Sequence, residues 1–321
     1  MGVRAVVVGF GGTSAISLVS AGLNPLESPV EPMIHEREPS ADRTASRTAL
    51  GAARLRAAHL IVDNPPPIFE DPLALRLLDP EESRTIREGA ERLHTPVYRA
   101  LRSDVVTRSR YAEDRLADAV RRGVRQYVIL GAGLDTFAYR QPAWAGELSI
   151  FEVDHAATQL DKRARLGRAG IGPPSNLRYA AADLETDALA PVLCAAGLDP
   201  TRPAFVACLG VLIYLSEGAA GAIFDMAAGL PRGSEFVFEF SRPDDSTAAA
   251  PARSSAAAFV EATGEPWRTR FEPGALAARL KSAGFSSISL LFASDLTERY
   301  LRGRTDGLRS PSRVVLAHAT V

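Results

Sequence analysis

Apolar and polar positions follow two different patterns along the chain, and the change falls near residue 125. Between residues 44 and 122, apolar side chains recur at the spacing of amphipathic helices. Ser46, Pro72 and Gly123 stand where a helix cap, a first helical turn and a helix stop are expected. We therefore expect a helical segment over residues 44–125.

Beyond residue 125, short apolar runs alternate with amphipathic stretches. Five runs have the length of buried strands: 127–131, 148–154, 177–183, 204–210 and 235–240. Helical patterns separate these runs, and two further strand candidates, 287–293 and 312–320, follow near the end of the chain. Short buried strands that alternate with helices predict an α/β fold, with a parallel sheet covered on both faces.

The first 43 residues continue neither pattern. An apolar run ends in GFGGTS, residues 9–14, and the stretch that follows, NPLESPVEPMIHEREPSAD, is rich in Pro, Glu and Ser. A dinucleotide-binding fold would lead from such a glycine turn into a second strand, and none follows here. We interpret residues 1–43 as a disordered or peripheral extension, or as the product of a start codon placed too far upstream. Residues 44–321 then form the functional domain, with a helical cap to residue 125 and the α/β core from residue 126.

Composition narrows the classes of function. The chain has 321 residues, is 46% hydrophobic and carries a formal net charge of -1. Near-neutral charge with interleaved signs lacks the basic field that nucleic acid binding needs. No apolar run reaches the ~20 residues of a membrane span. Cys194 and Cys208 belong to no CxxC or Cys/His cluster, so we expect no disulfide framework, no metal site and a cytoplasmic protein.

A glycine turn ends the first strand candidate, in VILGAGLDTFAYR. Gly131 and Gly133 form GxG at the carboxyl end of a strand, where glycine lets the backbone approach a ligand closely. Thr136 occupies the place of the third glycine of GxGxxG, which serves packing beneath a pyrophosphate. With Asp135 before it, this sequence favours a ligand that lies over the turn without a diphosphate. A plain tight turn is the alternative.

Acidic residues end the next two strand candidates. Asp154 comes some twenty residues beyond the glycine turn, where a carboxylate can accept both hydroxyls of a ribose. Capping of the following helix is the alternative role for Asp154. Asp183 and Leu184 end the third strand, where they are positioned for an adenine amino group and an apolar ring face.

The motifs SRTA, IFEDPLA, TRSRYAEDRL, VILGAGLDTFAYR, FEVDHAATQLDKR, AADL and LGVLIYLSEGA occur in this order. Together they resemble the leucine carboxyl methyltransferase superfamily. The bacterial branch is most similar, the class I S-adenosyl-L-methionine-dependent methyltransferases that include polyketide O-methyltransferases. The resemblance covers residues 44–320. It implies a Rossmann-like class I methyltransferase fold: a seven-stranded, mostly parallel sheet with an antiparallel last strand, plus an N-terminal helical cap.

The resemblance also implies which residues bind S-adenosyl-L-methionine. Carried over position by position, the family's glycine turn, ribose acid and adenine contacts correspond to Gly131, Ala132, Gly133, Asp154, Asp183 and Leu184. In the family an arginine upstream of the first strand binds the methionine carboxylate, and TRSRY offers Arg108 and Arg110. Arginine suits this role because its planar fork binds a carboxylate through two parallel hydrogen bonds.

Three further positions complete the expected cofactor site. Asp135 and His155 adjoin the glycine turn and Asp154 in sequence. Leu209 stands where protein-phosphatase methylating members, and many bacterial relatives, have Glu. This departure resembles the polyketide methyltransferase branch and counts against a phosphatase as substrate.

The motifs do not fix the methyl acceptor or a general base. Tyr214, just past the fourth strand, and His94 and Tyr98, in the helical cap, are the candidates for catalysis. We expect methyl transfer to a hydroxyl or carboxyl oxygen of a small molecule such as a polyketide, with no nucleic acid or membrane partner. The oligomeric state stays open. The alternatives are an NAD(P)-dependent oxidoreductase and a non-catalytic protein that binds S-adenosyl-L-methionine on the same fold.

Overall fold

The computed structural model of the chain describes residues 46–243 and 267–321, which all belong to the unit Pro39–Val321. The expectations for residues 1–43, GFGGTS among them, lie outside the described residues. The predicted division into a helical cap and an α/β core can be followed from Ser46 onward.

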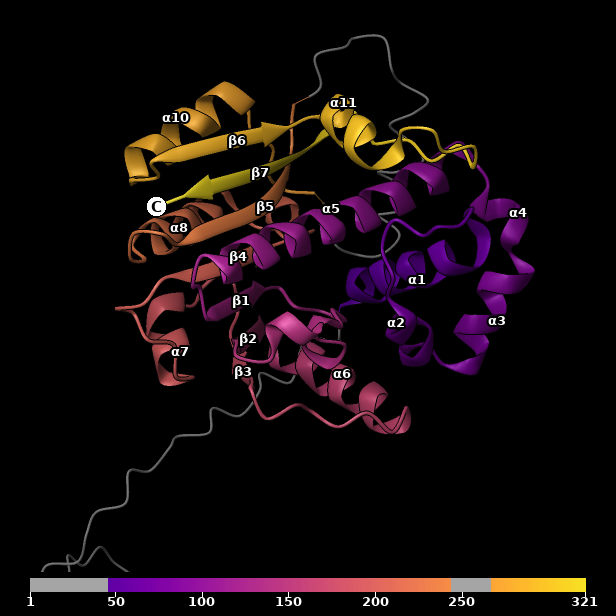
Figure 1. Cartoon of the computed structure of the whole chain (residues 1–321), viewed down its shortest axis with the longest axis horizontal. Coiled ribbons are helices and arrows are strands. Elements are labelled where there is room, and N and C mark those ends of the chain that lie inside the picture. The colour runs from indigo at the N-terminus through magenta and orange to yellow at the C-terminus, as the bar shows by residue number, and fades with distance from the viewer. Residues whose placement is uncertain (1–45, 244–266) are drawn as a thin grey trace, which may run out of the picture. The chain divides into compact units, whose positions relative to one another are not determined.

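Seven strands form one sheet in the order β3-β2-β1-β4-β5-β7-β6 (Figure 1). Their bounds are β1 Gln126–Leu130, β2 Ser149–Asp154, β3 Leu177–Ala181, β4 Ala204–Cys208, β5 Glu235–Ser241, β6 Ser287–Leu291 and β7 Val314–Thr320. Neighbours from β3 to β5 pair in parallel, whereas β7 runs antiparallel to both β5 and β6. The predicted seven-stranded sheet with an antiparallel last strand is confirmed.

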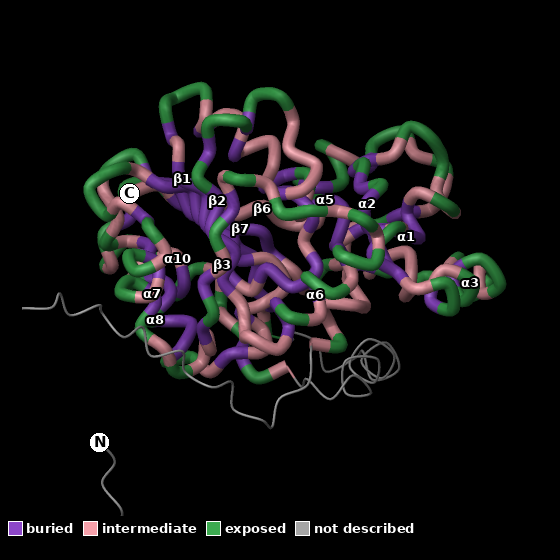
Figure 2. Tube along the Cα trace, turned by 90° about the horizontal axis from the view of Figure 1, so that it is seen from below, coloured by how far each residue is buried: buried purple, intermediate pink, exposed green. Residues whose placement is uncertain are grey.

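Helices cover both faces of this sheet. Strands β1, β4 and β5 are buried along their whole length, as runs of apolar residues require in a parallel sheet. Figure 2 shows buried residues gathered along the strands of the sheet. One face packs against α7 (Leu189–Ala195), α8 (Glu217–Ala228) and α10 (Pro273–Ala283). The other packs against α5 (Pro96–Arg121), and α6 (Ala156–Arg168) reaches it through Lys162, which is paired with Glu152 of β2. The central strands are therefore closed to water on both faces, which leaves their ends as the accessible edges.

The helical cap is built by α1 (Arg47–Val62), α2 (Pro72–Leu77), α3 (Pro80–Glu88), α4 (Ala90–Leu93) and the first turns of α5. Ser46, Asp71 and Asp79 cap the first three helices by accepting a hydrogen bond from the backbone N–H three residues further on. Pro72 begins α2, and Gly123, with φ +100°, follows the end of α5, as predicted. Within the helical segment predicted over residues 44–125, the chain is interrupted at Gly89, which caps α3, and before Pro96, which begins α5.

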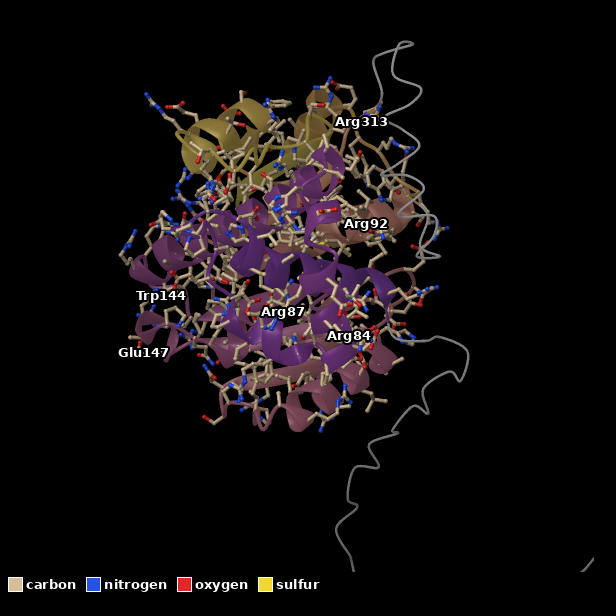
Figure 3. The ribbon with its side chains drawn as sticks, turned by 90° about the vertical axis from the view of Figure 1, so that its right-hand side faces the viewer. Arg84, Arg87, Arg92, Trp144, Glu147 and Arg313 are labelled. Atoms are coloured by element: carbon tan, nitrogen blue, oxygen red, sulfur yellow. The ribbon has the colours of Figure 1, made fainter. Side chains whose placement is uncertain are left out.

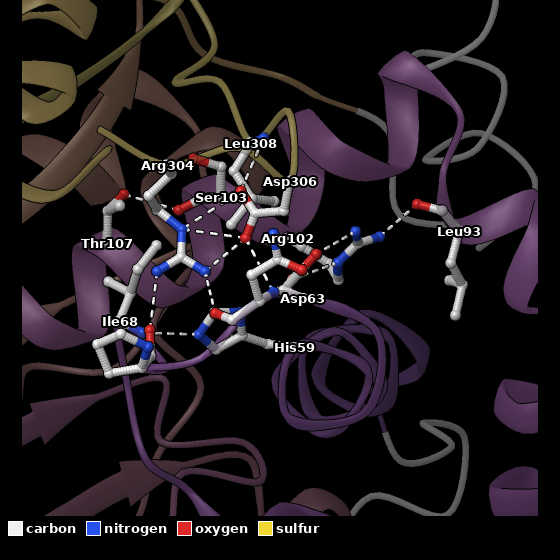
Figure 4. Close-up of polar contacts among 12 residues, drawn as sticks. His59, Asp63, Ile68, Leu93, Arg102, Ser103, Thr107, Arg304, Asp306 and Leu308 are labelled. Carbon is white, nitrogen blue, oxygen red and sulfur yellow. Dashed lines mark hydrogen bonds and ion pairs between the residues drawn. The ribbon is translucent and has the colours of Figure 1, made fainter. Parts of the chain in front are cut away.

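A buried ion pair joins α1 to α5 within the cap (Figure 4). Arg102 donates from Nε and Nη2 to the two carboxylate oxygens of Asp63, at 2.9 and 2.7 Å. His59 lies 2.9 Å from Asp63 through Nδ1 and accepts the backbone N–H of Ile68 at Nε2, 2.9 Å away. Burial acts to raise the pKa of Asp63, but the bonds from Arg102 and His59 outweigh it and lower that pKa. The pair therefore holds the cap in one arrangement.

The segment after β6 packs on the same part of the cap. It contains α11 (Ala293–Leu296) and a π-helical turn, Thr297–Leu301. Arg304 donates to the carbonyl oxygens of Asn64 and Pro66, and Asp306 accepts the N–H of Asn64 at 3.1 Å (Figure 4). The C-terminal part of the chain thus fixes the position of the cap over the sheet.

Charged side chains of both signs cover the cap side of the molecule. Figure 3 shows this side with Arg84, Arg87 and Arg92 labelled, and with carboxylate and guanidinium groups interspersed around them. Arg84, for example, is paired with both Glu81 and Glu88. This mixture agrees with the near-neutral net charge. In the described part of the chain, no helix has the length and apolar character of a membrane span.

Candidate functional site

A cavity of about 270 Å³ lies where β1, β2 and β4 end, between these strand ends and helices α1 and α5. Its lining residues fall within 46–56, 105–109, 127–135, 154–155, 182–184 and 207–215. Ligands of open α/β sheets bind at this edge because the strand-to-helix turns expose backbone groups there. We call it the first cavity.

The predicted glycine turn forms one wall of the first cavity. Gly131 and Gly133 have φ values of +64° and +47°, which favour glycine. A Cβ on Gly131 would lie 2.3 Å from Val211 Cγ2, and one on Gly133 would lie 2.9 Å from Ala49 Cβ. Ala132, between them, donates its N–H to the carbonyl of Val153 at 3.1 Å. At both positions, a residue larger than glycine would collide with a neighbouring side chain.

Asp154 lies opposite this turn, at the end of β2. Its Oδ2 accepts the N–H of Gly133 at 2.6 Å, and its Oδ1 accepts the N–H of His155 at 2.7 Å. Burial raises the pKa of Asp154, although these two backbone bonds act to lower it. The N-cap of α6 is His155, whose Nδ1 accepts the N–H of Ala157 at 3.3 Å, so Asp154 is not the helix cap. Two carboxylate oxygens offer about four lone pairs, so two bonds leave acceptor capacity for a ligand.

Asp135, Asp183 and Leu184 also line the first cavity. Asp135 follows the glycine turn, and its Oδ1 accepts the N–H of Phe137 at 2.8 Å. Asp183 follows β3, and its Oδ1 accepts the N–H of Glu185 at 3.0 Å. These short-range bonds fix the two carboxylates after the carboxyl ends of β1 and β3, which lie on either side of β2 in the sheet.

Arg108 enters the site from α5 and binds two carboxylates. Its Nη1 donates to Asp104 Oδ2 at 3.2 Å and to Glu239 Oε1, at the end of β5. Gly210, with φ +71°, makes room for the guanidinium, since a Cβ there would lie 2.5 Å from Arg108 Nη2. Burial raises the pKa of Glu239 to about 8, even though Arg108 acts to lower it. Burial also raises the pKa of Asp104.

Three residues predicted for the site lie outside it. Arg110 is half exposed and paired with Asp114. It stands two residues from Arg108 on one helix, and residues at that spacing point to different sides. His94 is the exposed residue that ends α4, and Tyr98 packs in the first turn of α5 beneath Arg92. None of the three is among the residues that line the first cavity.

Tyr214 and Leu209 do line it. Tyr214 ends a 3-10 helix, Leu212–Tyr214, that follows β4. Leu209 immediately follows β4 and packs against the apolar cluster beneath α5. Both residues stand where β4 meets the cavity, as their place in the sequence predicted.

A second cavity, of about 100 Å³, adjoins the first. The two share six lining residues: Thr48, Ala52, Val105, Arg108, Ile213 and Tyr214. The second cavity extends toward the carboxyl end of β5, where Glu239, Phe240 and Ser241 line it together with Trp267. Its surface is mainly apolar.

Sequence reasoning missed Gly210, Glu239 and Arg56. Gly210 follows β4 as Gly131 follows β1, so the same strand-and-glycine signal was present in CLGVL. Glu239 was visible as an acid near the end of the apolar run EFVFEF. Arg56 joins the cap to the glycine turn by donating to Asp71 at 2.8 Å and to the carbonyl of Leu134 at 2.5 Å, and no local pattern indicates this contact.

Comparison with known proteins now gives the family. The model of a family described as leucine carboxyl methyltransferase matches residues 49–228. A Bacillus subtilis (strain 168) protein named "Putative S-adenosyl-L-methionine-dependent methyltransferase YktD" is 30% identical over 300 residues, which cover 86% of this chain and 97% of that protein. The chain belongs to the leucine carboxyl methyltransferase family and is an S-adenosyl-L-methionine-dependent methyltransferase.

Solved structures agree on the fold. A "duf574 family protein" of Streptomyces avermitilis and a "putative methyltransferase" of Thermobifida fusca YX have TM-scores of 0.53 and 0.55 with this chain. Each is 17% identical to it; the matches cover 86% and 87% of this chain and 97% and 96% of theirs. The likeness supports the class I methyltransferase fold and says nothing of the acceptor.

Proposed function

We propose that the enzyme transfers the methyl group of S-adenosyl-L-methionine to an oxygen of a small molecule. The observation that carries this proposal is the pair of adjoining cavities. The first has about 270 Å³ at the strand ends where ligands of this fold bind, and the second has about 100 Å³ beneath the cap. Two reactants can lie side by side there.

The residues of the first cavity fit S-adenosyl-L-methionine. The glycine turn is a cradle that a Cβ at Gly131 or Gly133 would fill. In our proposal Asp154 accepts the ribose hydroxyls, because its oxygens retain acceptor capacity. Asp183 and Leu184 take the adenine, with Ala132, Asp135, His155 and Leu209 completing the wall.

Arg108 is the arginine we assign to the methionine carboxylate. Both of its ion pairs leave from Nη1, so the other N–H groups of the fork are available for a carboxylate. Arg110 drops out of the proposal because it lies outside the cavity lining and pairs with Asp114 at the surface.

When bound, the cofactor supplies a methyl carbon that is already electrophilic. The protein therefore has to hold the acceptor oxygen in line with that carbon, and alignment of two reactants can contribute roughly 7–11 kcal/mol. Tyr214 lines both cavities, which places it between the two reactants in this proposal. His94 and Tyr98 have no part in it, since neither lines a cavity.

The choice of a small acceptor rests on size and charge. A second cavity of about 100 Å³ under the cap fits a compact group better than a folded partner. A net charge of -1 provides no attraction for nucleic acid. Leu209 replaces the acid found in the protein-methylating relatives. Family membership removes the alternative of an NAD(P)-dependent oxidoreductase.

The test is incubation of the full chain with methyl-labelled S-adenosyl-L-methionine and four acceptor sets: aromatic polyketides, fatty acids, peptides and RNA. We expect label in a polyketide or fatty acid. Label confined to peptide or RNA would reject the small-molecule proposal. Binding of S-adenosylhomocysteine without transfer to any set would place the acceptor outside these four classes.

A further inference from the structure

The second cavity contains an unusual set of polar atoms. Among the described residues, eight buried side-chain N or O atoms have no hydrogen-bond partner, and three of them belong to residues that line this small cavity. They are Glu239 Oε2, Ser241 Oγ and Trp267 Nε1. Buried polar atoms are nearly always bonded, because an unpaired one loses its bond to water without compensation. Three such atoms therefore belong to residues that line one small, mainly apolar cavity, and a ligand held there is the explanation that we develop.

The sheet itself brings two of these residues together. Glu239 and Ser241 stand two apart on β5, and side chains at that spacing point to the same face of a strand. Both are almost fully buried, with exposed fractions of 3% and 1%. Trp267 lines the cavity with them. The three groups are an acceptor, a donor that can also accept, and a pure donor.

We propose that this cavity, which adjoins the cofactor site of the function proposed above, binds the hydroxyl end of the methyl acceptor, with Glu239 as the group that takes its proton. Trp267 Nε1 and Ser241 Oγ bond the oxygen of that end, and the apolar lining excludes charged and strongly hydrated groups. About 100 Å³ is less than the ~150 Å³ cavity that admits a benzene ring, so only the reacting end enters. The substrate class is therefore a compact alcohol, or a larger molecule with an exposed hydroxyl arm.

The transfer balances with the groups named. The acceptor oxygen forms its bond to the methyl carbon while the sulfur–methyl bond breaks, and the sulfur keeps that electron pair as a thioether. The hydroxyl proton passes to Glu239 Oε2 and from there to solvent. A base of this kind contributes about 10²–10⁴-fold for a hydroxyl. A carboxylate acceptor would bring a second negative charge against Glu239 once that residue is ionised.

The charges around Glu239 come from three elements. The titratable groups near Glu239 and its partner Arg108 are Asp104 on α5, Cys208 on β4 and Tyr214 in the 3-10 helix after β4. Burial raises the pKa of Cys208, so its thiol stays neutral. Glu239, with a pKa raised to about 8 by burial, changes charge between pH 6 and 9. Ligands of fixed charge therefore report on its ionisation.

The experiment uses 1-butanol and butyrate, which have similar size. From pH 6 to 9, 1-butanol stays neutral and butyrate stays an anion. Their binding to the full chain saturated with S-adenosylhomocysteine is measured by ligand-observed NMR. We expect butyrate to weaken at least fivefold as pH rises from 6 to 9, and 1-butanol to change less than twofold. Glu239→Gln should remove most of the loss for butyrate. Ser241→Ala and Trp267→Phe should each weaken 1-butanol about threefold or more.

Matched controls come from the same strand and the same residue type. Glu235→Gln changes another buried glutamate on the same face of β5, and Trp144→Phe changes the other tryptophan of the chain, which is at the surface (Figure 3). Neither control should alter binding of the two probes. In the Trp144→Phe protein, Trp267 is the remaining tryptophan, so 1-butanol should shift its fluorescence.

The outcomes separate this inference from the proposed function. Failure to bind S-adenosylhomocysteine, measured by calorimetry, would reject the cofactor assignment. Normal S-adenosylhomocysteine binding with no bound 1-butanol would overturn only the hydroxyl site. Equal binding of butyrate at pH 6 and pH 9 would also overturn the hydroxyl site alone. So would a Glu239→Gln protein in which butyrate binding keeps its full pH dependence.

Discussion

The two ends of β5 carry the same residue in the same setting, with opposite consequences. Glu235 and Glu239 lie on one face of the strand, both are buried, and each is paired with an arginine: Arg122, which follows the end of α5, or Arg108, within α5. Glu235, at the amino end, is bonded by Arg122 and by His318, whose Nε2 lies 2.7 Å away. Burial acts to raise the pKa of Glu235, but these bonds outweigh it and lower that pKa. At Glu239 burial prevails and raises it.

The two glutamates differ in how many of their carboxylate oxygens have a hydrogen-bond partner. Both oxygens of Glu235 have partners, whereas Glu239 Oε2 has none in the described part of the chain and Asp104 adds a like charge nearby. An amino end that is fully bonded serves stability. A carboxyl end that keeps an unpaired carboxylate oxygen and a cavity costs stability and suits ligand binding. The carboxyl ends of β1 to β4 likewise lead into the first cavity.

The largest effect is expected when a methyl group enters the glycine turn. Gly131→Ala places a Cβ 2.3 Å from Val211 Cγ2 and pushes the turn into the cofactor space, so S-adenosyl-L-methionine should bind roughly 100-fold more weakly. Gly233→Ala is the control at the amino end of β5. It also has a positive φ, +91°, but its Cβ would be 3.9 Å from Pro203. Calorimetry that gives equal affinities for the two variants would contradict the assignment of the turn.

A somewhat smaller effect is expected at Asp154. Asp154→Ala removes the proposed ribose acceptor and leaves the N–H groups of Gly133 and His155 without that carboxylate, at about 1–3 kcal/mol, or roughly 5- to 150-fold in affinity. Glu147→Ala, an acidic residue just before the amino end of β2 and paired with Arg125, is the control. Isothermal titration with S-adenosylhomocysteine should find Glu147→Ala unchanged. Wild-type affinity in Asp154→Ala would remove this residue from the site.

Replacement of each glutamate of β5 by Gln should change stability with a different dependence on pH. Glu235 has a lowered pKa, so its stabilisation is complete above its ordinary value and is lost only in acid. Glu235→Gln should therefore cost about 1 kcal/mol at both pH 7 and pH 9. Glu239 has a pKa of about 8, above its ordinary value, so the folded state binds the extra proton and the wild type loses stability as pH rises through that range.

Glu239→Gln removes this loss. Its free energy of unfolding relative to the wild type should rise from pH 7 to pH 9, whereas that of Glu235→Gln should stay level. Urea unfolding of the three proteins at both pH values measures this. A flat difference for Glu239→Gln would show that the carboxyl group is ionised in the folded state throughout this range.

The sequence predicted the features that depend on neighbouring residues and missed those that depend on distant contacts. Gly131, Gly133, Asp154 and Asp183 were found because each stands directly after an apolar run, and parallel strands bring their carboxyl ends together. The number of strands and the antiparallel direction of the last one followed from the resemblance, whereas the order of the strands in the sheet was not predicted. These features depend on contacts within a few residues of a strand end.

It was harder to predict which side of a helix points into the site and which faces of a strand are covered. Arg108 and Arg110 are equivalent in composition and differ only in which side of α5 they occupy, which depends on how the helix packs. His94 and Tyr98 were expected near the acceptor because they belong to the cap, but the cap presents α1 and the middle of α5 to the site instead. Glu239 needed the knowledge that β5 is covered on both faces, which turns an ordinary acid into a buried one.

The smallest effect is expected when the chain is shortened ahead of the first described residue. The described residues that line either cavity begin at Ser46, which caps α1, and Thr48 lies in both linings. Removal of residues 1–40 therefore leaves both ends of β5 and the whole described lining in place. We expect the affinity for S-adenosylhomocysteine to stay within about twofold, well below the ~1.4 kcal/mol of a tenfold change. The measurement compares the full chain with residues 41–321 by calorimetry, after thermal unfolding has shown equal stability. A tenfold loss of affinity in an equally stable protein would mean that GFGGTS, and not only the turn at Gly131, contributes to the nucleotide site.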